Sequence, residues 1–360
     1  MTVSRIYVLA LMLSAPSFVL SETNNFEMVR VTDGVYAAIR KEPPGLTVNG
    51  NSVFIINDHD VIVVDTTLTP GTAKEELAAL RRLTSKPVKY VINTHWHDDH
   101  TMGNQTYRDA FPGVEFIAHA RTREYLPATG LKNRKEAMSA DGYPGFIAGL
   151  RDSLHQNKTF SGAAMDEETR AAYTSDLEIA EQYMAENPGV EIVLPTITLE
   201  QQLTLHRGSR IIDIRFLGRG HTSGDIVVHL PKEGIIIAGD LVISPVPYVG
   251  NPQSHPADWS ATLEKLLALP HSAIIPGHGP ILRDDTYVKL MARLFDAISQ
   301  QVAAAVARGE TEQQARKNIN LTEMKNSFAG NSQIRKEIFD SYVTGPAISA
   351  AFADASPAKP

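Results

Sequence analysis

Residues 94–100, with the sequence THWHDDH, concentrate three histidines and two aspartates in one short stretch. The stretch directly follows an apolar run ending at Asn93, so a rigid strand would hold these side chains in an accessible loop. In an extended chain His95 and His97 point to the same side and can share one cation. The turn that follows can direct Asp99 and His100 at a second cation. The alternative interpretation is a histidine-rich surface loop.

Three further metal-capable residues lie downstream, each after an apolar run and each beside glycine. They are His221 in GHTSGD (220–225), Asp240 in AGD (238–240) and His278 in PGHG (276–279). Glycine allows the backbone to turn sharply next to a metal. One such residue alone would be weak evidence, but together and in this order they favour a metal site. The sequence contains no cysteine, so histidines and carboxylates must supply the ligands.

At these residues the sequence resembles the metallo-β-lactamase superfamily, whose pattern is His-x-His-x-Asp-His, then a His, an Asp or Cys, and a final His. The resemblance extends roughly from Val31 to Arg283 and includes all seven ligand positions. It implies an α+β fold, the four-layer αββα sandwich, in which two mixed β-sheets pack face to face with helices outside. The metal site would lie along one edge of the sheets.

The resemblance also implies how the ligands are shared between two metals. The first metal would be bound by three histidines, His95, His97 and His221. The second would be bound by Asp99, His100 and His278, and Asp240 would bridge the two. Asp65, directly after the strand-like run 61–64, matches an aspartate that orients one of the ligands.

Two departures narrow the class. Asp240 stands where cysteine-containing β-lactamases carry a thiolate, and the following Leu241-Val242-Ile243 offers no lysine for a β-lactam carboxylate. The ligand set resembles that of glyoxalase II, the acyl-homoserine-lactone lactonases and uncharacterised exported hydrolases more than that of dedicated β-lactamases.

The expected chemistry follows from these ligands. Two divalent ions about 3.5–4 Å apart can bridge one water and lower its pKa toward ~7, which gives a hydroxide nucleophile at neutral pH. Asp99 is the expected catalytic residue, since it can accept a hydrogen bond from that hydroxide and carry its proton. Thr222 and Asp225 would position His221. We expect two Zn²⁺ ions, although such a ligand set also accepts iron, manganese or cobalt.

The first 21 residues have the layout of a secretory signal peptide. One positive charge at Arg5 precedes a mostly apolar run to Leu20, and small or slight side chains, Val19 and Ser21, precede a polar segment. A membrane anchor is the alternative, but roughly 15 apolar residues interrupted by Pro16 are short for a span of ~20. We expect a periplasmic or secreted protein with no stable membrane insertion after signal cleavage.

Hydrophobic patterns predict alternating strands and helices. Strands are expected at 35–41, 52–57, 61–65, 88–93, 114–118, 191–205, 210–217, 226–230, 235–238 and 273–275, with helices from 70 and over 256–269. The predicted metallo-β-lactamase domain spans 26–283 and includes a helical insert at 121–188. A helical C-terminal extension at 284–353 and a disordered tail at 354–360 complete the chain.

Candidates for substrate contact lie after Asp240 in a segment rich in loop-forming residues. They are Tyr248, Asn251, His255 and Trp259. The insert carries Tyr125, Tyr143, Phe146 and Phe160 and could act as a lid or a homodimer surface, although aromatic helices more often form core. His119 ends a strand, where a structural hydrogen bond is the expected role.

The favoured function is an exported dinuclear zinc hydrolase that cleaves an ester, lactone, thioester or β-lactam bond of a small molecule. A phosphodiesterase of the same superfamily is the first alternative, since two metals also suit phosphoryl transfer. The second is a non-catalytic metal-binding accessory protein of a periplasmic redox system. The net charge of -7 offers no basic excess for a phosphate backbone, so nucleic acid is not an expected partner.

Overall fold

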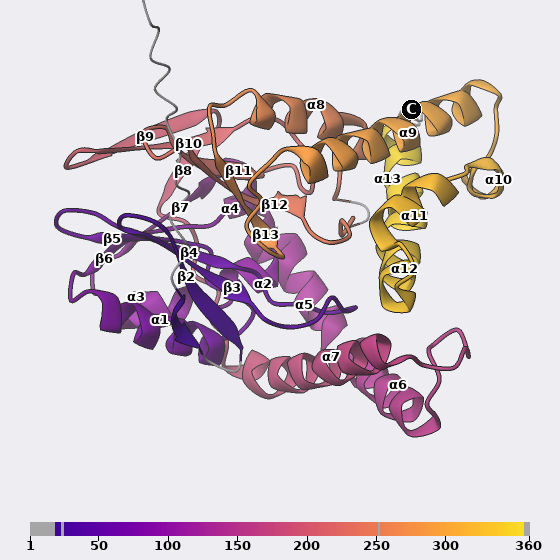
Figure 1. The fold of residues 1–360 in the computed structure, drawn as a ribbon, viewed down its shortest axis with the longest axis horizontal. Helices are drawn as coiled ribbons and strands as arrows, with labels where there is room; N and C mark the ends of the chain where they lie inside the picture. Colours follow the sequence, from indigo (N-terminus) through magenta and orange to yellow (C-terminus); the bar gives the residue numbers. More distant parts are fainter. Residues whose placement is uncertain (1–18, 23–24, 251–252, 356–360) are drawn as a thin grey trace, which may run out of the picture.

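The computed structural model describes residues 19–22, 25–250 and 253–355 (Figure 1). Eight strands form the first sheet, in sequence order from edge to edge. They are β1 (Val19–Glu22), β2 (Phe26–Thr32), β3 (Val35–Arg40), β4 (Ser52–Ile56), β5 (Val61–Val64), β6 (Val88–Ile92), β7 (Glu115–His119) and β8 (Ile197–Leu199). The first five strands pair antiparallel, whereas β5 to β8 run parallel.

Five strands form the second sheet, in the order β13-β12-β11-β10-β9. They are β9 (Gln202–Arg207), β10 (Arg210–Phe216), β11 (Ile226–Leu230), β12 (Ile235–Ile243) and β13 (Ala273–His278). Only β12 and β13 pair in parallel; the other neighbours are antiparallel. Both sheets are therefore mixed, as expected.

Three buried apolar clusters hold four layers together. The central cluster lies between the sheets and joins residues such as Val53, Ile92, Ile214 and Ile237. A second cluster packs the first sheet against α1 (Pro70–Leu83) and α3 (Asn104–Ala110). The third packs the second sheet against α8 (Pro256–Leu267), α9 (Thr286–Ala307) and the C-terminal helices. The arrangement is the predicted αββα sandwich (Figure 1).

Helix α1 shows how local sequence sets an outer layer. Thr69 adopts extended backbone and its hydroxyl accepts the Thr72 N–H, while Pro70 occupies the first turn, where its missing N–H costs no hydrogen bond. Leu77 and Leu80, three residues apart, lie on the buried face. The helix thus begins at the predicted residue, and Leu77 and Leu80 pack it against the sheet.

Two groups of helices flank the sandwich. Between β7 and β8 the chain forms α4 (Ala120–Tyr125), η1 (Leu126–Gly130), α5 (Leu131–Ala137), α6 (Tyr143–Gln156), α7 (Glu167–Glu186) and η2 (Asn187–Gly189). After α9 it forms α10 (Glu312–Asn318), α11 (Thr322–Ala329), α12 (Gln333–Phe339), η3 (Asp340–Thr344) and α13 (Pro346–Ala355). The groups meet where the Tyr173 hydroxyl donates to Glu337 at 2.6 Å.

The structure differs from the sequence-based expectations at several places. Strand β2 was not expected, and the predicted strand 191–205 is β8 and β9 separated by a bend at residues 200–201, with no strand over 191–196. Strand β12 runs beyond Ala238 to Ile243, and β13 runs beyond Ile275 to His278. Asp354 and Ala355, assigned to the tail, belong to α13, and 356–360 lie outside the described residues.

The signal-peptide prediction also falls mainly outside the described residues, which include only Val19–Glu22 of that end and place them in β1. Among the helices that are described, none combines the length and the apolar character that crossing a bilayer requires.

Candidate metal centre

The seven predicted ligands meet where the two sheets share an edge. His95 and His97 lie in the segment after β6, and Asp99 and His100 lie in the short helix α2 (Asp98–Thr101) that follows. The second sheet contributes His221 from the β10–β11 connection, Asp240 from within β12 and His278 from the end of β13. Asp240 lies within β12, whereas the sequence predicted a strand at 235–238 with Asp240 after it. It follows Gly239, whose φ of 52° accompanies a register irregularity between β12 and β13.

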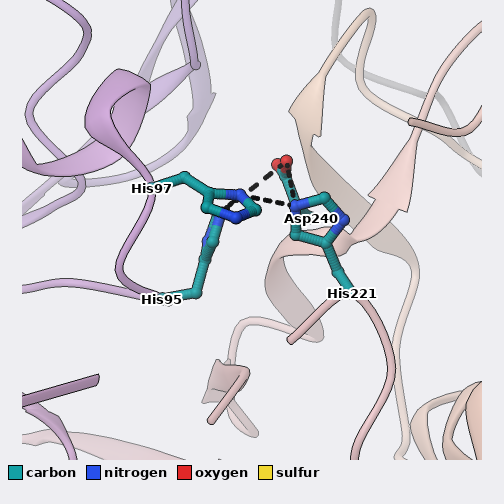
Figure 2. Close-up of side chains that lie close together, drawn as sticks. All are labelled: His95, His97, His221 and Asp240. Atoms are coloured by element: carbon teal, nitrogen blue, oxygen red, sulfur yellow. Dashed lines mark hydrogen bonds and ion pairs between the residues drawn. The ribbon is translucent and has the colours of Figure 1, made fainter. Parts of the chain in front are cut away.

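The first cluster contains His95, His97, His221 and Asp240 (Figure 2). His97 Nδ1 lies 3.1 Å from His95 Nε2 and 2.8 Å from His221 Nε2. Asp240 Oδ2 lies 3.3 Å from His221 Nε2 and 3.8 Å from His95 Nε2. Four candidate ligand atoms therefore surround one small volume, which is the number of ligands in a tetrahedrally coordinated metal site.

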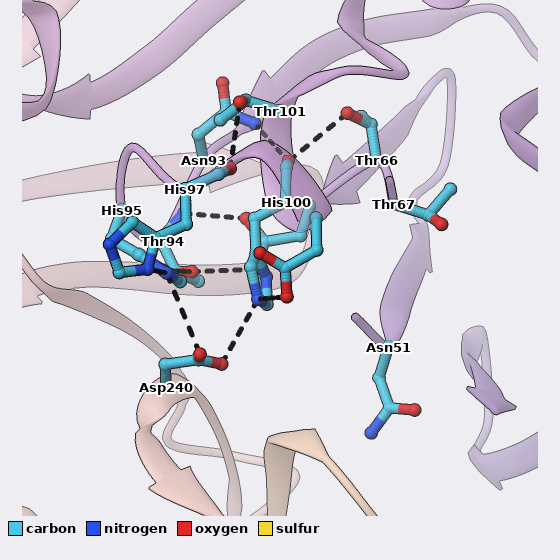
Figure 3. A network of polar contacts seen from close by, with 12 residues as sticks. Asn51, Thr66, Thr67, Asn93, Thr94, His95, His97, His100, Thr101 and Asp240 are labelled. Atoms are coloured by element: carbon cyan, nitrogen blue, oxygen red, sulfur yellow. Dashed lines mark hydrogen bonds and ion pairs between the residues drawn. The ribbon is translucent and has the colours of Figure 1, made fainter. Parts of the chain in front are cut away.

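The second cluster contains Asp99, His100, His278 and the same Asp240 (Figure 3 shows His100 and Asp240). His278 Nε2 lies 3.0 Å from Asp99 Oδ2, and His100 Nε2 lies 3.2 Å from both Asp99 Oδ2 and Asp240 Oδ1. Buried atoms His100 Nε2 and Asp240 Oδ1 have no hydrogen-bond partner of acceptable geometry. Because unpartnered buried polar atoms are costly, this donor set fits a bound cation.

The second ring nitrogen of each buried histidine ligand is held by another group. His100 Nδ1 lies 2.9 Å from Asp65 Oδ2, as expected, and His95 Nδ1 lies 3.1 Å from Thr94 Oγ1. His221 Nδ1 lies 3.0 Å from the Tyr248 carbonyl oxygen, and His278 Nδ1 lies 3.1 Å from that of Asn49. Such contacts fix the orientation of metal-binding imidazoles. The sequence does not reveal the two carbonyl contacts, because any residue type supplies a carbonyl.

Asp65 connects the histidine motif to the end of β5. It adopts a left-handed backbone with φ of 59°. Its Oδ1 accepts the Thr94 N–H at 2.8 Å and its Oδ2 accepts the Thr94 hydroxyl at 2.7 Å. A non-glycine residue held in this region costs about 1–3 kcal/mol, and the surrounding contacts must maintain it. Asp65 therefore contacts both the ligand His100 and Thr94, which directly precedes the ligand His95.

Thr222 and Asp225 shape the turn that carries His221. Asp225 Oδ2 accepts the Thr222 N–H at 2.8 Å and its Oδ1 accepts the Thr222 hydroxyl at 2.6 Å. Burial raises the pKa of Asp225 to about 7, although the bonds from Thr222 oppose this rise. Both residues are buried and belong to neither cluster, in keeping with a positioning role.

The two clusters differ in electrostatics. Burial lowers the pKa of His95 and His97, and it lowers the pKa of His221 to about 3. Burial also acts on His278, but the carboxylates of Asp240 and Asp99 overcome it and raise its pKa to about 9. The pKa of His100 is raised for the same reason. Cations bound here would replace these protons as the balancing charge, so binding would release protons.

The clusters form the floor of a cavity of about 420 Å³. Apolar residues such as Leu46, Val48 and Leu68 line it, together with four tyrosines that we call the aromatic wall: Tyr143, Tyr183, Tyr248 and Tyr342. Of the described residues that line the cavity, none is lysine or arginine. Gly130, Asn133 and Ala137 of the helical insert also contribute, so the insert forms one side of the cavity.

The predicted substrate contacts fare differently. Tyr248 lines the cavity. Trp259 does not, because it is fully buried, stacks on Phe295 and donates from Nε1 to the Leu241 carbonyl. His255 faces a separate cleft, where it contacts Ser223 at 2.7 Å and Asp354 at 3.5 Å. Asn251 lies outside the described residues. His119 caps α4 and contacts the Glu200 carbonyl, the structural role expected for it.

Comparison with known proteins agrees with this geometry. The sequence profile of the metallo-β-lactamase superfamily matches residues 45–278, which include all seven ligands. The chain belongs to this superfamily. The matched relatives of assigned activity are hydrolases, and with its two His/Asp clusters this chain is a metallo-hydrolase of the superfamily.

Similar solved metallo-β-lactamases include FIM-1 from Pseudomonas aeruginosa in its mono-zinc form, with a TM-score of 0.51 and 18% identity over 76% of this chain and 95% of that one. The enzyme from Pontibacter korlensis gives a TM-score of 0.51 and 18% identity, covering 75% of this chain and 99% of that one. At these identities the likeness shows the fold alone.

Curated relatives include a linear primary-alkylsulfatase from a Pseudomonas species, 26% identical over 66% of this chain and 43% of its own length. A hydroxyacylglutathione hydrolase from Gloeobacter violaceus is 39% identical over 21% of this chain and 30% of its own length. The matched part of the chain thus corresponds to less than half of either relative.

Proposed function

We infer that this metallo-β-lactamase superfamily member hydrolyses an ester, lactone or thioester of a small, largely apolar molecule with two divalent cations, Zn²⁺ being the expected ion. One observation carries the proposal. Two ligand clusters share Asp240 at the floor of a cavity whose described walls are mostly apolar and aromatic and include no lysine or arginine.

The residues of the chain would divide the work. Bound divalent cations would supply activation of water and polarisation of the scissile bond. Asp240 would hold both cations together. Asp99 has a side chain that is 20% exposed, against 4% for Asp240, so it is the ligand carboxylate that substrate and water reach more easily. Asp99 would accept the proton of the attacking water and return it to the leaving group.

The aromatic wall and the apolar residues beside it would exclude water and orient the substrate.

The attraction of His100 and its neighbours holds the pKa of Asp99 well below its usual range, although burial opposes this. The Asp99 carboxylate is therefore ionised and ready to accept a hydrogen bond. β-Lactam hydrolysis is a secondary expectation, because the described lining offers no cationic side chain for the β-lactam carboxylate. The same observation disfavours a phosphodiesterase.

A sulfate ester is the second candidate substrate. The alkylsulfatase relative supports it, since it matches 66% of this chain at 26% identity, and an apolar cavity suits an alkyl group. In that case the cations alone would have to balance the sulfate charge.

The test is metal content per chain together with turnover of an aryl ester, an acyl lactone, a thioester, a chromogenic cephalosporin and an alkyl sulfate, before and after chelation. Two bound metals and chelator-sensitive turnover of an ester, lactone or thioester are expected. Turnover of the alkyl sulfate alone would favour the second candidate. Bound metal without turnover of any of the five would contradict the proposal and favour the accessory-protein alternative.

We further propose export to the periplasm or outside the cell, on the signal-peptide pattern of residues 1–21. Expression of the full chain followed by cell fractionation and mass measurement tests this. The expected product is found outside the cytoplasm and lacks about 21 residues. A full-length product in the membrane fraction would instead indicate an anchor.

A further inference from the structure

An apolar groove of about 580 Å³ adjoins the metal cavity. Five residues line both: Leu46, Thr47, Ala137, Tyr143 and Tyr342. They come from the β3–β4 connection, from the end of α5, from the start of α6 and from η3. Because the two spaces share these residues, they are neighbours, and a substrate bound over the metal floor would reach the groove by passing Tyr143 and Tyr342.

A ladder of aromatic rings leads from the floor along this groove. Tyr183 and Tyr143 have ring centroids 4.6 Å apart, and Tyr143 and Phe146 follow at 6.2 Å. Phe146 and Phe160 are 6.0 Å apart. Tyr183 donates its hydroxyl to Asp98, the neighbour of the ligand Asp99, at 2.9 Å. The ladder therefore begins beside the metal ligands and ends at Phe160.

The polar ends of the tyrosines are occupied elsewhere. The Tyr143 hydroxyl contacts Thr47 Oγ1 at 3.0 Å, and the Tyr342 hydroxyl donates to the Leu46 carbonyl. With their hydroxyls bonded to protein, these residues offer a ligand ring carbons rather than hydrogen-bond donors. The groove would bind its occupant through apolar contact.

The outer end of the groove is apolar and open. Phe160 is 46% exposed and is the one exposed large hydrophobic residue of the described chain. The charged residue of the described groove lining is Asp141, which is exposed and would repel an anionic group. The end of the occupant that reaches Phe160 should therefore be neutral and apolar.

We propose that this groove binds the unbranched alkyl or acyl chain of the substrate while the scissile bond lies over the metal floor. This specificity site rests on the proposed hydrolase function and extends it to substrates with medium or long chains. The groove lies beside the metal cavity and shares five lining residues with it, which favours a substrate chain over a polypeptide segment as the occupant.

Chain-length dependence tests the site during turnover. With aryl esters of increasing acyl length, kept below their micellar concentrations, kcat/KM should rise about fourfold for each methylene, since each buried methylene contributes ~0.8 kcal/mol. In Phe160→Ala the rise should stop at a shorter chain. Phe111→Ala is the matched control, because Phe111 is a half-buried aromatic residue that packs against the cluster between the first sheet and α1. It should keep the wild-type profile.

Binding of 1-octanol and 1-butanol, measured by calorimetry on the chelated and the metal-loaded protein, tests the groove without turnover. Four additional methylenes should tighten binding about two-hundredfold, and Phe160→Ala should reduce that ratio at least tenfold.

Octanol binding that depends on Phe160, without turnover of any ester, would contradict the proposed function and leave the groove supported. Turnover with a flat chain-length profile and no octanol preference would overturn the groove and leave the function supported. A change of oligomeric state in Phe160→Ala, with a flat profile, would identify the groove as a contact between copies and also overturn it.

Discussion

The metal floor and the aromatic wall of the cavity use polar atoms in opposite ways. On the floor, imidazoles and carboxylates from both sheets converge on two small volumes and leave His100 Nε2 and Asp240 Oδ1 without hydrogen-bond partners. On the wall, the hydroxyls of the tyrosines that line the cavity are bonded to other groups of the protein. The floor therefore offers buried donor atoms that a cation could bind, whereas the polar atoms of the wall already have partners within the protein. Substitutions on the floor should act on chemistry, and those on the wall on binding and stability.

The largest expected effect comes from Asp240→Asn. This change removes the one carboxylate shared by both clusters, so we expect loss of at least one metal per chain and a fall in turnover on the order of 10³-fold. Metal analysis and steady-state kinetics measure both. Asp98→Asn is the control, because Asp98 lines the same cavity but belongs to neither cluster. Equal metal loss in both variants would contradict the assigned role of Asp240.

Asp65→Asn should act on the floor through His100. Removing the carboxylate that orients a ligand is expected to weaken metal binding about 10–100-fold, and chelator competition measures this. Asp213→Asn provides a control, since Asp213 is a buried aspartate bonded to Thr204 in the second sheet and contacts neither cluster. Unchanged metal affinity in Asp65→Asn would mean that Thr94 and the backbone alone fix the motif.

Asp176 of α7 holds Leu46 and Thr47, to which two tyrosines of the wall are bonded, and it should make the stability of the protein depend on pH. The carboxylate accepts the N–H groups of Leu46 and Thr47, and burial raises its pKa to about 7. The folded protein therefore binds this proton more tightly than the unfolded chain, and the stability contribution is lost as pH rises through about 7. The slope is at most about 1.4 kcal/mol per pH unit.

Urea unfolding of the wild type and Asp176→Asn at pH 5 and pH 7.5 isolates this contribution. The free energy of unfolding of the wild type, relative to the variant, should fall by about 2 kcal/mol between the two conditions. Both proteins keep every metal ligand, so the difference cancels the pH dependence of metal binding. A difference that is constant with pH would show that Asp176 does not titrate in this range.

Tyr183→Phe should have the smallest effect. It removes the bond to Asp98 but keeps the ring, so the free energy of unfolding should fall by about 1 kcal/mol and KM should change more than kcat, with metal content intact. Tyr107→Phe is the matched control, because Tyr107 is buried and its hydroxyl has no hydrogen-bond partner. Its loss should cost no stability. A larger loss in Tyr107→Phe than in Tyr183→Phe would contradict this comparison.

The floor could be predicted from the sequence because its chemistry is local. Each ligand sits within a few residues of a glycine or another ligand, and each follows or lies in an apolar run that reveals a strand. Strand β2 could have been found in part, since the fully buried Phe26 and Met28 lie on either side of the polar Glu27, the alternation of a half-buried strand.

The wall could not be predicted in the same way. Tyr183 meets Asp98 across 85 positions, and Leu46 meets Asp176 across 130, so no local pattern reports these contacts. Trp259 was wrongly predicted to contact substrate because it follows the ligand Asp240 closely in the sequence. It lies on the buried face of α8, where it packs in the core. Proximity in sequence to Asp240 did not indicate that α8 lies away from the metal cavity, which no residue of this helix lines.

Both clusters take ligands from each of the two sheets, since the histidine motif follows β6 whereas Asp240 and His278 belong to β12 and β13. A cation bound in either cluster would therefore cross-link the two sheets. Its binding energy is shared with folding, and at a free concentration of about 1,000 times Kd it would add about 4 kcal/mol to the stability of the chain. A shortage of metal would then lower the free energy of unfolding of the chain as well as stop its turnover.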